Sequence, residues 1–388
     1  MGKYNFDEVI DRHGTDCLKY DFGMKRKGRD DLLPLWVADM DFRLPDEILD
    51  EFLKRIDHGI FGYTDPLDEY FAAMNHWFST RYGYTIEPEW VTLGAGIVYA
   101  LGTSVRAFTE EGDAMMVMQP VYYPFSEVIK NDGRRLVNCQ LRYENNHYSI
   151  DFEKMEKMIR EEGVKALIFC NPHNPVGRVW SKEELTRLGD ICVKYHVTVV
   201  SDEIHEDFVF KGKHQVFANI KKEYEEITVT CTAPSKTFNI ASLMISNILI
   251  PNPELKRKFK HQLDAAGISQ LNVLGLVACE AAYEHGEEWY QAMKTYVKEN
   301  IEFVKQYVEK QLPGVNMVEH EGTYLVWLDF RGTGLSVEEL DDKIINQAKL
   351  WLDSGKIFGS CGEGFQRINV ACPRATLTEA LERIRKAF

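Results

Sequence analysis

Two residues that could do chemistry stand directly after short β-rich runs of the sequence. Lys236 lies in Ala233-Pro234-Ser235-Lys236-Thr237-Phe238-Asn239, just past the run 227–231, and Asp202 lies in Ser201-Asp202-Glu203-Ile204-His205, at the end of another run. Burial at a strand end lowers the pKa of a lysine toward that of an amine nucleophile, which could form a Schiff base. A carboxylate there could pair with a protonated ring nitrogen. A solvated loop lysine and a helix N-cap are the alternative interpretations, and His205 alone supplies too few ligands for a metal.

Two further signatures could contact oxygen atoms of a ligand. Asn171-Pro172-His173-Asn174-Pro175-Val176-Gly177 follows an apolar run, and its two Asn-Pro steps favour a turn-rich path from which Asn174 could point an amide donor at a cofactor oxygen. Gly94-Ala95-Gly96-Ile97-Val98-Tyr99 opens a helical stretch, where free backbone N–H groups could cradle a phosphate. An ordinary rigid turn and a plain tight turn are the alternatives for these two segments.

The surrounding elements have the pattern of an α/β sheet. Continuous apolar runs at 114–118, 166–170, 197–200 and 227–230 are typical of strands buried on both faces of a mostly parallel sheet. Ser181-Lys182-Glu183-Glu184 is a capping box that predicts a helix between two of these strands. Apolar residues at helical spacing predict a long amphipathic helix over 289–308. Open α/β sheets bind ligands at strand ends, which is where the signatures fall.

Composition excludes several other classes of protein. The 388 residues carry 60 acidic and 46 basic side chains, a net charge of -14, which disfavours binding to nucleic acid. Eight scattered cysteines include no CxxC pair, so we expect reduced, mostly buried thiols and no metal centre. The sequence starts with no signal-peptide pattern and has no apolar stretch long enough to span a bilayer, so we expect a cytoplasmic protein.

Phosphate cradle, Asn, Asp and Lys occur in the order that a pyridoxal phosphate site needs. In this order the sequence resembles the fold-type I pyridoxal phosphate enzymes, the aspartate aminotransferase superfamily. Four motifs are similar to those of the MalY/PatB-type cystathionine β-lyases: Leu33-Pro34-Leu35-Trp36-Val37-Ala38-Asp39-Met40-Asp41-Phe42, His58-Gly59-Ile60-Phe61-Gly62-Tyr63-Thr64, Pro120-Val121-Tyr122-Tyr123-Pro124-Phe125 and Arg367-Ile368-Asn369-Val370-Ala371-Cys372-Pro373-Arg374. The resemblance runs from about Phe6 to the C-terminus. It implies an α/β fold whose large cofactor-binding domain, residues 46–285, has a mixed, mostly parallel seven-stranded sheet, with 1–45 and 286–388 forming a smaller α+β domain.

The resemblance also implies how the cofactor, pyridoxal 5'-phosphate, would be held. Lys236 would bind it covalently, Asp202 would pair with the pyridine nitrogen, and Asn174 would hydrogen-bond the phenolic oxygen. Tyr122 would stack on the ring, although core packing is an alternative for one of Tyr122 and Tyr123. The phosphate would be bound by the backbone of the Gly96, Ile97 and Val98 turn, by the hydroxyl of Ser235, and by Tyr63 of a second subunit. The implied assembly is therefore a homodimer with a shared site.

The partner would be a small-molecule amino-acid substrate. Arg367 would clamp its α-carboxylate through a two-pronged ion pair, with Arg374 as the rival. Val37 and Ala38 would line the pocket, and Tyr123 would lie near the substrate. The implied reaction is β-elimination from cystathionine or a related cysteine S-conjugate, which gives a thiol, pyruvate and ammonia, with Lys236 as general base. An aminotransferase and a regulatory protein that binds the cofactor are the alternatives.

Two positions depart from the family pattern. Met244 stands where aspartate aminotransferases carry a phosphate-binding arginine, which argues against a simple aminotransferase. Ser242 stands where glycine is common in the lyase group.

Overall fold

The computed structural model describes residues 3–268 and 270–388. Its central element is a seven-stranded sheet in the order β2-β10-β9-β8-β7-β3-β4, in which β10 runs antiparallel to both of its neighbours and the other pairs are parallel. The mixed, mostly parallel sheet expected from the sequence is thereby confirmed. The strands are β2 (Val91–Gly94), β3 (Ala114–Val117), β4 (Arg135–Asn138), β7 (Val164–Cys170), β8 (Thr198–Asp202), β9 (Thr228–Thr232) and β10 (Ser246–Leu249).

Helices cover both faces of this sheet. Apolar side chains of α4, α5 and α9 form one buried cluster with the strands, and those of α6 and α7 form another. Because both faces are covered, β3, β7, β8 and β9 appear in the sequence as the four continuous apolar runs. The helices around the sheet are α3 (Asp68–Tyr82), α4 (Ile97–Phe108), α5 (Pro124–Asn131), α6 (Phe152–Glu162), α7 (Lys182–Lys194), α8 (Lys222–Glu225), α9 (Pro253–Ala265) and α10 (Val273–His285).

The predicted capping box is present at the start of α7. The Ser181 hydroxyl accepts a hydrogen bond from the backbone N–H of Glu184 at 3.2 Å, and the Glu184 carboxylate accepts one from the backbone N–H of Ser181 at 2.8 Å. Two of the N–H groups that a helix start leaves without partners are satisfied in this way.

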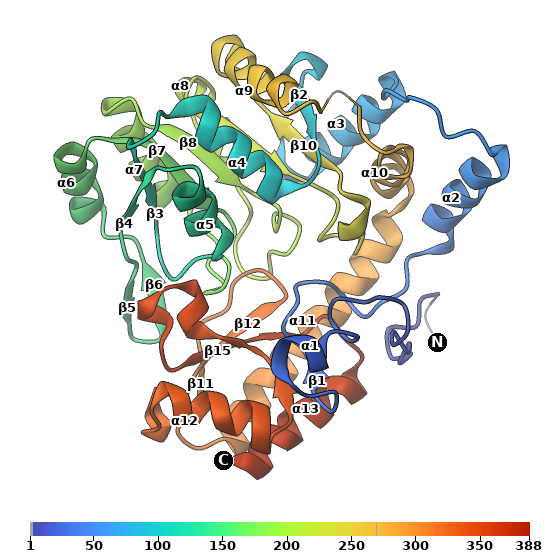
Figure 1. Cartoon of the computed structure of the whole chain (residues 1–388), viewed down its shortest axis with the longest axis vertical. Coiled ribbons are helices and arrows are strands. Elements are labelled where there is room, and N and C mark those ends of the chain that lie inside the picture. The colour runs from blue at the N-terminus through green and yellow to red at the C-terminus, as the bar shows by residue number, and fades with distance from the viewer. Residues whose placement is uncertain (1–2, 269) are drawn as a thin grey trace.

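A second, four-stranded antiparallel sheet has the order β11-β12-β15-β14. Figure 1 shows these C-terminal elements, orange to red, gathered at the lower end of the molecule, with α11 running up beside them. The predicted long helix is α11, which extends beyond 289–308 at both ends. The elements of this part are α11 (Glu287–Gln311), β11 (Asn316–Met317), β12 (Leu325–Asp329), α12 (Val337–Asp342), β13 (Leu350–Trp351), β14 (Asp353–Ser354), β15 (Phe365–Asn369) and α13 (Arg374–Ala387), and the hairpin of β5 (Arg142–Glu144) and β6 (His147–Ser149) lies at the edge of the large sheet.

The N-terminal segment packs against the C-terminal part of the chain. It contains α1 (Gly23–Lys27) and β1 (Leu33–Pro34), and β1 pairs in parallel with β13. The ring of Phe6 packs against the rings of Trp289 and Tyr296 on α11. These contacts support placing residues 1–45 with 286–388, and the boundaries next to α2 (Asp46–His58) and α11 remain our proposal.

Two simpler expectations concern membranes and thiols. Across residues 3–268 and 270–388, no helix combines the length and the apolar character that a bilayer crossing requires. All eight cysteines are free and six are buried, which confirms the expectation of reduced, mostly buried thiols.

Candidate active site

The carboxyl ends of three central strands lie in register. Cys170 of β7 pairs with Asp202 of β8, and Asp202 pairs with Cys231 of β9. Residues that follow these positions emerge at one edge of the sheet, which brings together the Asn174 turn, Asp202 and the Lys236 loop. Open α/β sheets offer this edge to their ligands.

Lys236 is enclosed at this edge and has one short hydrogen bond. Its Nζ donates to the carbonyl oxygen of Ala38 at 2.6 Å. Burial lowers the pKa of Lys236 to about 8, with Asp39 and Asp202 opposing the shift and Arg367 adding to it. A lysine with this pKa has about a tenth of its amine in the neutral form at pH 7, far more than an ordinary lysine, and the neutral form is what a nucleophile or a general base requires.

Asp202 is buried, and its neighbours only partly stabilise the negative charge of its carboxylate. Its Oδ1 accepts a hydrogen bond from the backbone N–H of Ile204 at 3.2 Å. Burial raises the pKa of Asp202 to about 7, although this N–H and the charge of Lys236 lower it. A buried carboxylate in this condition fits a cationic partner such as a protonated ring nitrogen.

Asn174 and Arg367 come together from the two sheets. Nη1 of Arg367, on β15, donates to Oδ1 of Asn174 at 3.0 Å, and Nη2 donates to the carbonyl oxygen of Trp36 at 2.8 Å and pairs with Asp353. Because the side-chain oxygen of Asn174 accepts from an arginine, its Nδ2 is the atom left to donate to a ligand oxygen. The rival Arg374 lies elsewhere, where it donates to Asn300 on α11 at 2.7 Å.

The two tyrosines lie beside the Asn174 turn. The backbone N–H of Tyr122 donates to the carbonyl oxygen of Asn174 at 3.0 Å, and the ring centroids of Tyr122 and Tyr123 are 5.4 Å apart. Burial raises the pKa of Tyr122. Burial, with the charges of Asp353 and Glu127, raises the pKa of Tyr123. Both hydroxyls are therefore protonated at neutral pH and able to donate a proton.

The segment predicted to cradle a phosphate lies at the start of α4. Gly96 is the N-cap residue, with a φ of +93° that an L side chain rarely adopts. The backbone N–H groups of Ile97 and Val98 belong to the first turn, whose N–H groups have no acceptor within the helix. Ser235 lies partly buried in the loop beside Lys236, whereas Met244 is exposed and supplies no cation to this region.

Three residues that shape the site were not identified from the sequence. Nδ2 of Asn369 donates to the carbonyl oxygen of Val37 at 2.7 Å, and the hydroxyl of Tyr324 donates to that of Ala38 at 3.0 Å. Together they hold the backbone that meets Lys236, while Asp353 holds Arg367. Asn369 belongs to the 367–374 motif, which does not reveal this contact, and no motif marks Tyr324 or Asp353, because the partners of all three are distant in sequence.

A buried cluster lies behind Asp202. Among the described residues, Glu203, Glu206 and His214 have potential metal-binding atoms within 4.8 Å of one another. In this structure Nε2 of His214 lies 2.7 Å from Oε2 of Glu203, whose Oε1 accepts from the Ser201 hydroxyl at 2.7 Å. The cluster therefore joins the loop after β8 to the segment around His214, a residue that the sequence interpretation did not single out.

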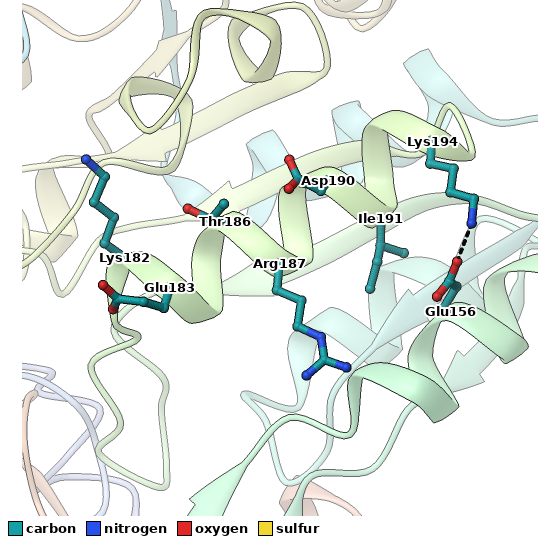
Figure 2. Close-up of a pocket in the computed structure, with 8 residues that line it drawn as sticks. All are labelled: Glu156, Lys182, Glu183, Thr186, Arg187, Asp190, Ile191 and Lys194. Carbon is teal, nitrogen blue, oxygen red and sulfur yellow. Dashed lines mark hydrogen bonds and ion pairs between the residues drawn. The ribbon is translucent and has the colours of Figure 1, made fainter.

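A separate cavity of about 560 Å³ lies on the outer surface of α6 and α7. Figure 2 shows its charged lining, which includes the ion pair of Lys194 with Glu156. The lining includes none of the strand-end group, by which we mean Asn174, Asp202, Lys236 and Arg367.

The fold and this strand-end arrangement define a class of protein. The sequence profile of the family "Aminotransferase class I and II" matches residues 30–384, and the chain belongs to this family. It is 43% identical to cystathionine beta-lyase PatB of Bacillus subtilis (strain 168), over 99% of this chain and 100% of that protein. It is 32% identical to protein MalY of Escherichia coli (strain K12), over 97% of each chain. Cystalysin from Treponema denticola, whose crystal structure contains a pyridoxal 5'-phosphate cofactor, matches with a TM-score of 0.96 and 39% identity, over 99% of this chain and 98% of that chain.

Proposed function

We propose that this protein is a pyridoxal phosphate-dependent carbon–sulfur β-lyase that cleaves cystathionine or a related cysteine S-conjugate to a thiol, pyruvate and ammonia. The observation that carries the proposal is the convergence of Lys236, Asp202, Asn174 and Arg367 at one sheet edge. Identity of 43% over the full length of a cystathionine β-lyase supports the same reaction.

The residues at the sheet edge fit the cofactor. When bound, it supplies an electron sink for negative charge at the α-carbon of the substrate. Asp202 would pair with its ring nitrogen, and Nδ2 of Asn174 would donate to its phenolic oxygen. Tyr122 would stack on the ring. The first turn of α4, from Gly96 to Val98, and the hydroxyl of Ser235 would bind the phosphate.

Arg367 would position the substrate. Asp353 and the Trp36 carbonyl hold the guanidinium, and its Nε has no hydrogen-bond partner among the described residues, which leaves donor capacity for an α-carboxylate. Val37 and Ala38 would line the pocket beside it. Alignment of the reacting C–H bond by such contacts contributes a large part of the rate acceleration in enzymes.

Lys236 and Tyr123 would move the protons. Nζ of Lys236 would act as the general base that removes the α-proton of the bound amino acid. The bond between the β-carbon and sulfur then breaks, and the hydroxyl of Tyr123, or the protonated Lys236, would donate a proton to the departing thiolate. Water hydrolyses the released aminoacrylate to pyruvate and ammonia.

The lyase is tested against the aminotransferase by the requirement for a keto acid. Purified protein loaded with pyridoxal phosphate is incubated with L-cystathionine, with and without an added keto acid, and pyruvate and thiol are measured. A lyase releases both without a keto acid. Strict dependence on the keto acid would identify an aminotransferase and reject the proposal.

The lowered pKa of Lys236 predicts how cofactor capture depends on pH. The neutral amine is the nucleophile, so with a pKa of about 8 the initial rate at which cofactor-free protein binds pyridoxal phosphate should rise about tenfold between pH 7 and pH 9 and then level off. The rate is followed by the appearance of the yellow absorbance. Nα-acetyl-lysine, the control, should continue to react faster above pH 9. A protein rate that follows the control instead would contradict the assignment of Lys236.

We also propose that two copies of the chain share their sites. The segment between α2 and α3, an extended stretch at the outer edge of Figure 1, exposes Ile60, Phe61, Tyr63 and Leu67, and Tyr63 is 97% exposed. Contiguous exposed apolar residues of this kind mark interaction surfaces. A second copy of the chain packed against this segment would place the Tyr63 of each copy near the phosphate in the site of the other. The homodimer and the cytoplasmic location both remain proposals.

Mixing two inactive variants tests the shared site. At a pyridoxal phosphate concentration just sufficient to saturate the wild type, we expect Tyr63→Ala to be inactive because it binds the cofactor weakly, and Lys236→Ala to be inactive because it lacks the reacting amine. Co-refolded in equal amounts, the two should recover roughly a quarter of the wild-type activity, because half of the dimers are mixed and each has one intact site. The control mixes Lys236→Ala with Asp202→Asn. Lys236 and Asp202 of one site come from the same chain, so each site of a mixed dimer carries one of the two substitutions and no site is intact. Recovery no greater than that of the control would refute sharing through Tyr63.

A further inference from the structure

A cleft of about 820 Å³ opens beside the proposed site. Tyr123, Asp353 and Trp36 line its inner end. The carboxylate of Asp353 and the carbonyl oxygen of Trp36 both accept hydrogen bonds from Arg367. Trp36 is two residues before Ala38, the carbonyl partner of Lys236. The cleft therefore adjoins the place where the bond to sulfur would break.

Two cations form the outer wall of this cleft. The rings of Trp36 and Trp351 stack with centroids 4.4 Å apart, Arg26 lies 5.6 Å from the centroid of Trp36, and Lys27 lies 5.6 Å from that of Trp351. Packing of this kind immobilises the stems of the side chains while their N–H groups stay free to donate. Within the part of the chain that the structure describes, Arg26 and Lys27 are in no ion pair.

Most of the other charged side chains in the cleft have an ion-pair partner. Lys356 pairs with Asp341 at 2.7 Å, and Asp353 pairs with Arg367, so these groups are already neutralised. Glu127, on α5 next to Tyr123, is exposed and lines the same cleft. The cleft is thus lined by the cations Arg26 and Lys27, by the carboxylate of Glu127, and by tryptophan and isoleucine side chains.

We propose that this cleft binds the departing thiol, and that Arg26 and Lys27 select leaving groups that carry a carboxylate. This inference rests on the proposed β-lyase function. The carboxylate at the far end of the leaving group would meet Arg26 and Lys27, and an amino group beside it would face Glu127. The methylene chain would lie against Trp36, with the sulfur toward Tyr123. Leaving thiols that are themselves amino acids match this pattern of charges.

Three substrates of equal chain length separate the charges of the leaving group. L-cystathionine releases a thiol with a carboxylate and an amino group, S-(3-carboxypropyl)-L-cysteine releases one with the carboxylate alone, and S-butyl-L-cysteine releases a neutral one. In the double variant Arg26→Gln/Lys27→Gln, kcat/KM for the two carboxylated substrates should fall about tenfold, mainly through KM. With S-butyl-L-cysteine it should change less than twofold. Lys25→Gln, in the same helix but outside the cleft, is the matched control and should leave all three unchanged.

Binding without turnover provides a second readout. In the background of Lys236→Ala, calorimetry should give a lower Kd for L-cystathionine than for S-butyl-L-cysteine, and the added Arg26→Gln/Lys27→Gln change should remove the difference. If the double variant lost kcat/KM equally for charged and neutral substrates, or for neither, the inference would be overturned and the lyase function would stand. Failure of the wild type to release thiol from any of the three would instead overturn the proposed function, and the inference with it.

Discussion

Lys236→Ala is expected to lower thiol release from L-cystathionine by about 10⁴–10⁶-fold, the loss typical of removing a reacting group. The variant lacks both the amine that would hold the cofactor and the base that would take the α-proton. Burial and the Ala38 carbonyl hold the amine of the wild type in place. The measurement is the initial rate of thiol release with saturating pyridoxal phosphate.

A second partly buried lysine provides the control. Lys294, on α11, also has a pKa lowered by burial, and its Nζ donates to the hydroxyl of Tyr290 at 2.9 Å. Lys294→Ala should retain activity within about twofold, because this site lies outside the strand-end group. Wild-type turnover by Lys236→Ala would contradict the mechanism. A regulatory role that survives Lys236→Ala while lyase turnover is absent from the wild type would favour the regulatory alternative.

Asp202→Asn should have opposite effects on activity and on stability. Without the carboxylate, positive charge on the ring nitrogen is no longer stabilised, so kcat should fall about 10²–10³-fold. The cofactor-free protein should become more stable at pH 8. The folded-state pKa of Asp202 is about 7, above the usual value of 3.8, so wild-type stability falls as pH rises between these values. Asparagine has no such ionisation.

Urea unfolding of the cofactor-free proteins measures this effect. The gain in the free energy of unfolding from Asp202→Asn should grow by about 2–3 kcal/mol from pH 5 to pH 8. Asp190 is the control, because its ion pair with Lys221 lowers its pKa, and Asp190→Asn should bring no gain at pH 8. A gain for Asp202→Asn that is equal at both pH values, or an unchanged kcat, would contradict the pairing of a buried carboxylate with the cofactor.

The parts of the fold that could be predicted have local causes. The capping box at Ser181 requires only residues three positions apart, and the apolar runs of β3, β7, β8 and β9 reflect burial on both faces of one sheet. The four-stranded sheet has no comparably clear signal, since β11 and β14 are two residues long and depend on pairing with β12 and β15.

The residues of the site also fall into those that the local sequence predicts and those that it does not. Asn174, Asp202 and Lys236 could be proposed because each lies at or shortly after the end of a strand, and register then brings them to one edge. Asp353 and Tyr324 could not, because each is chosen by a contact with a segment far away in the sequence. The role of Tyr63 depends on a second copy of the chain and stays a prediction.

Pyruvate formed per active site, in the absence of any keto acid, is the most direct test of the central claim. With pyridoxal phosphate-loaded protein and excess L-cystathionine, we predict linear release of pyruvate and thiol in equal amounts, well beyond one turnover per Lys236. Pyruvate that stops at or below one equivalent, or that requires a keto acid to continue, would contradict a β-lyase.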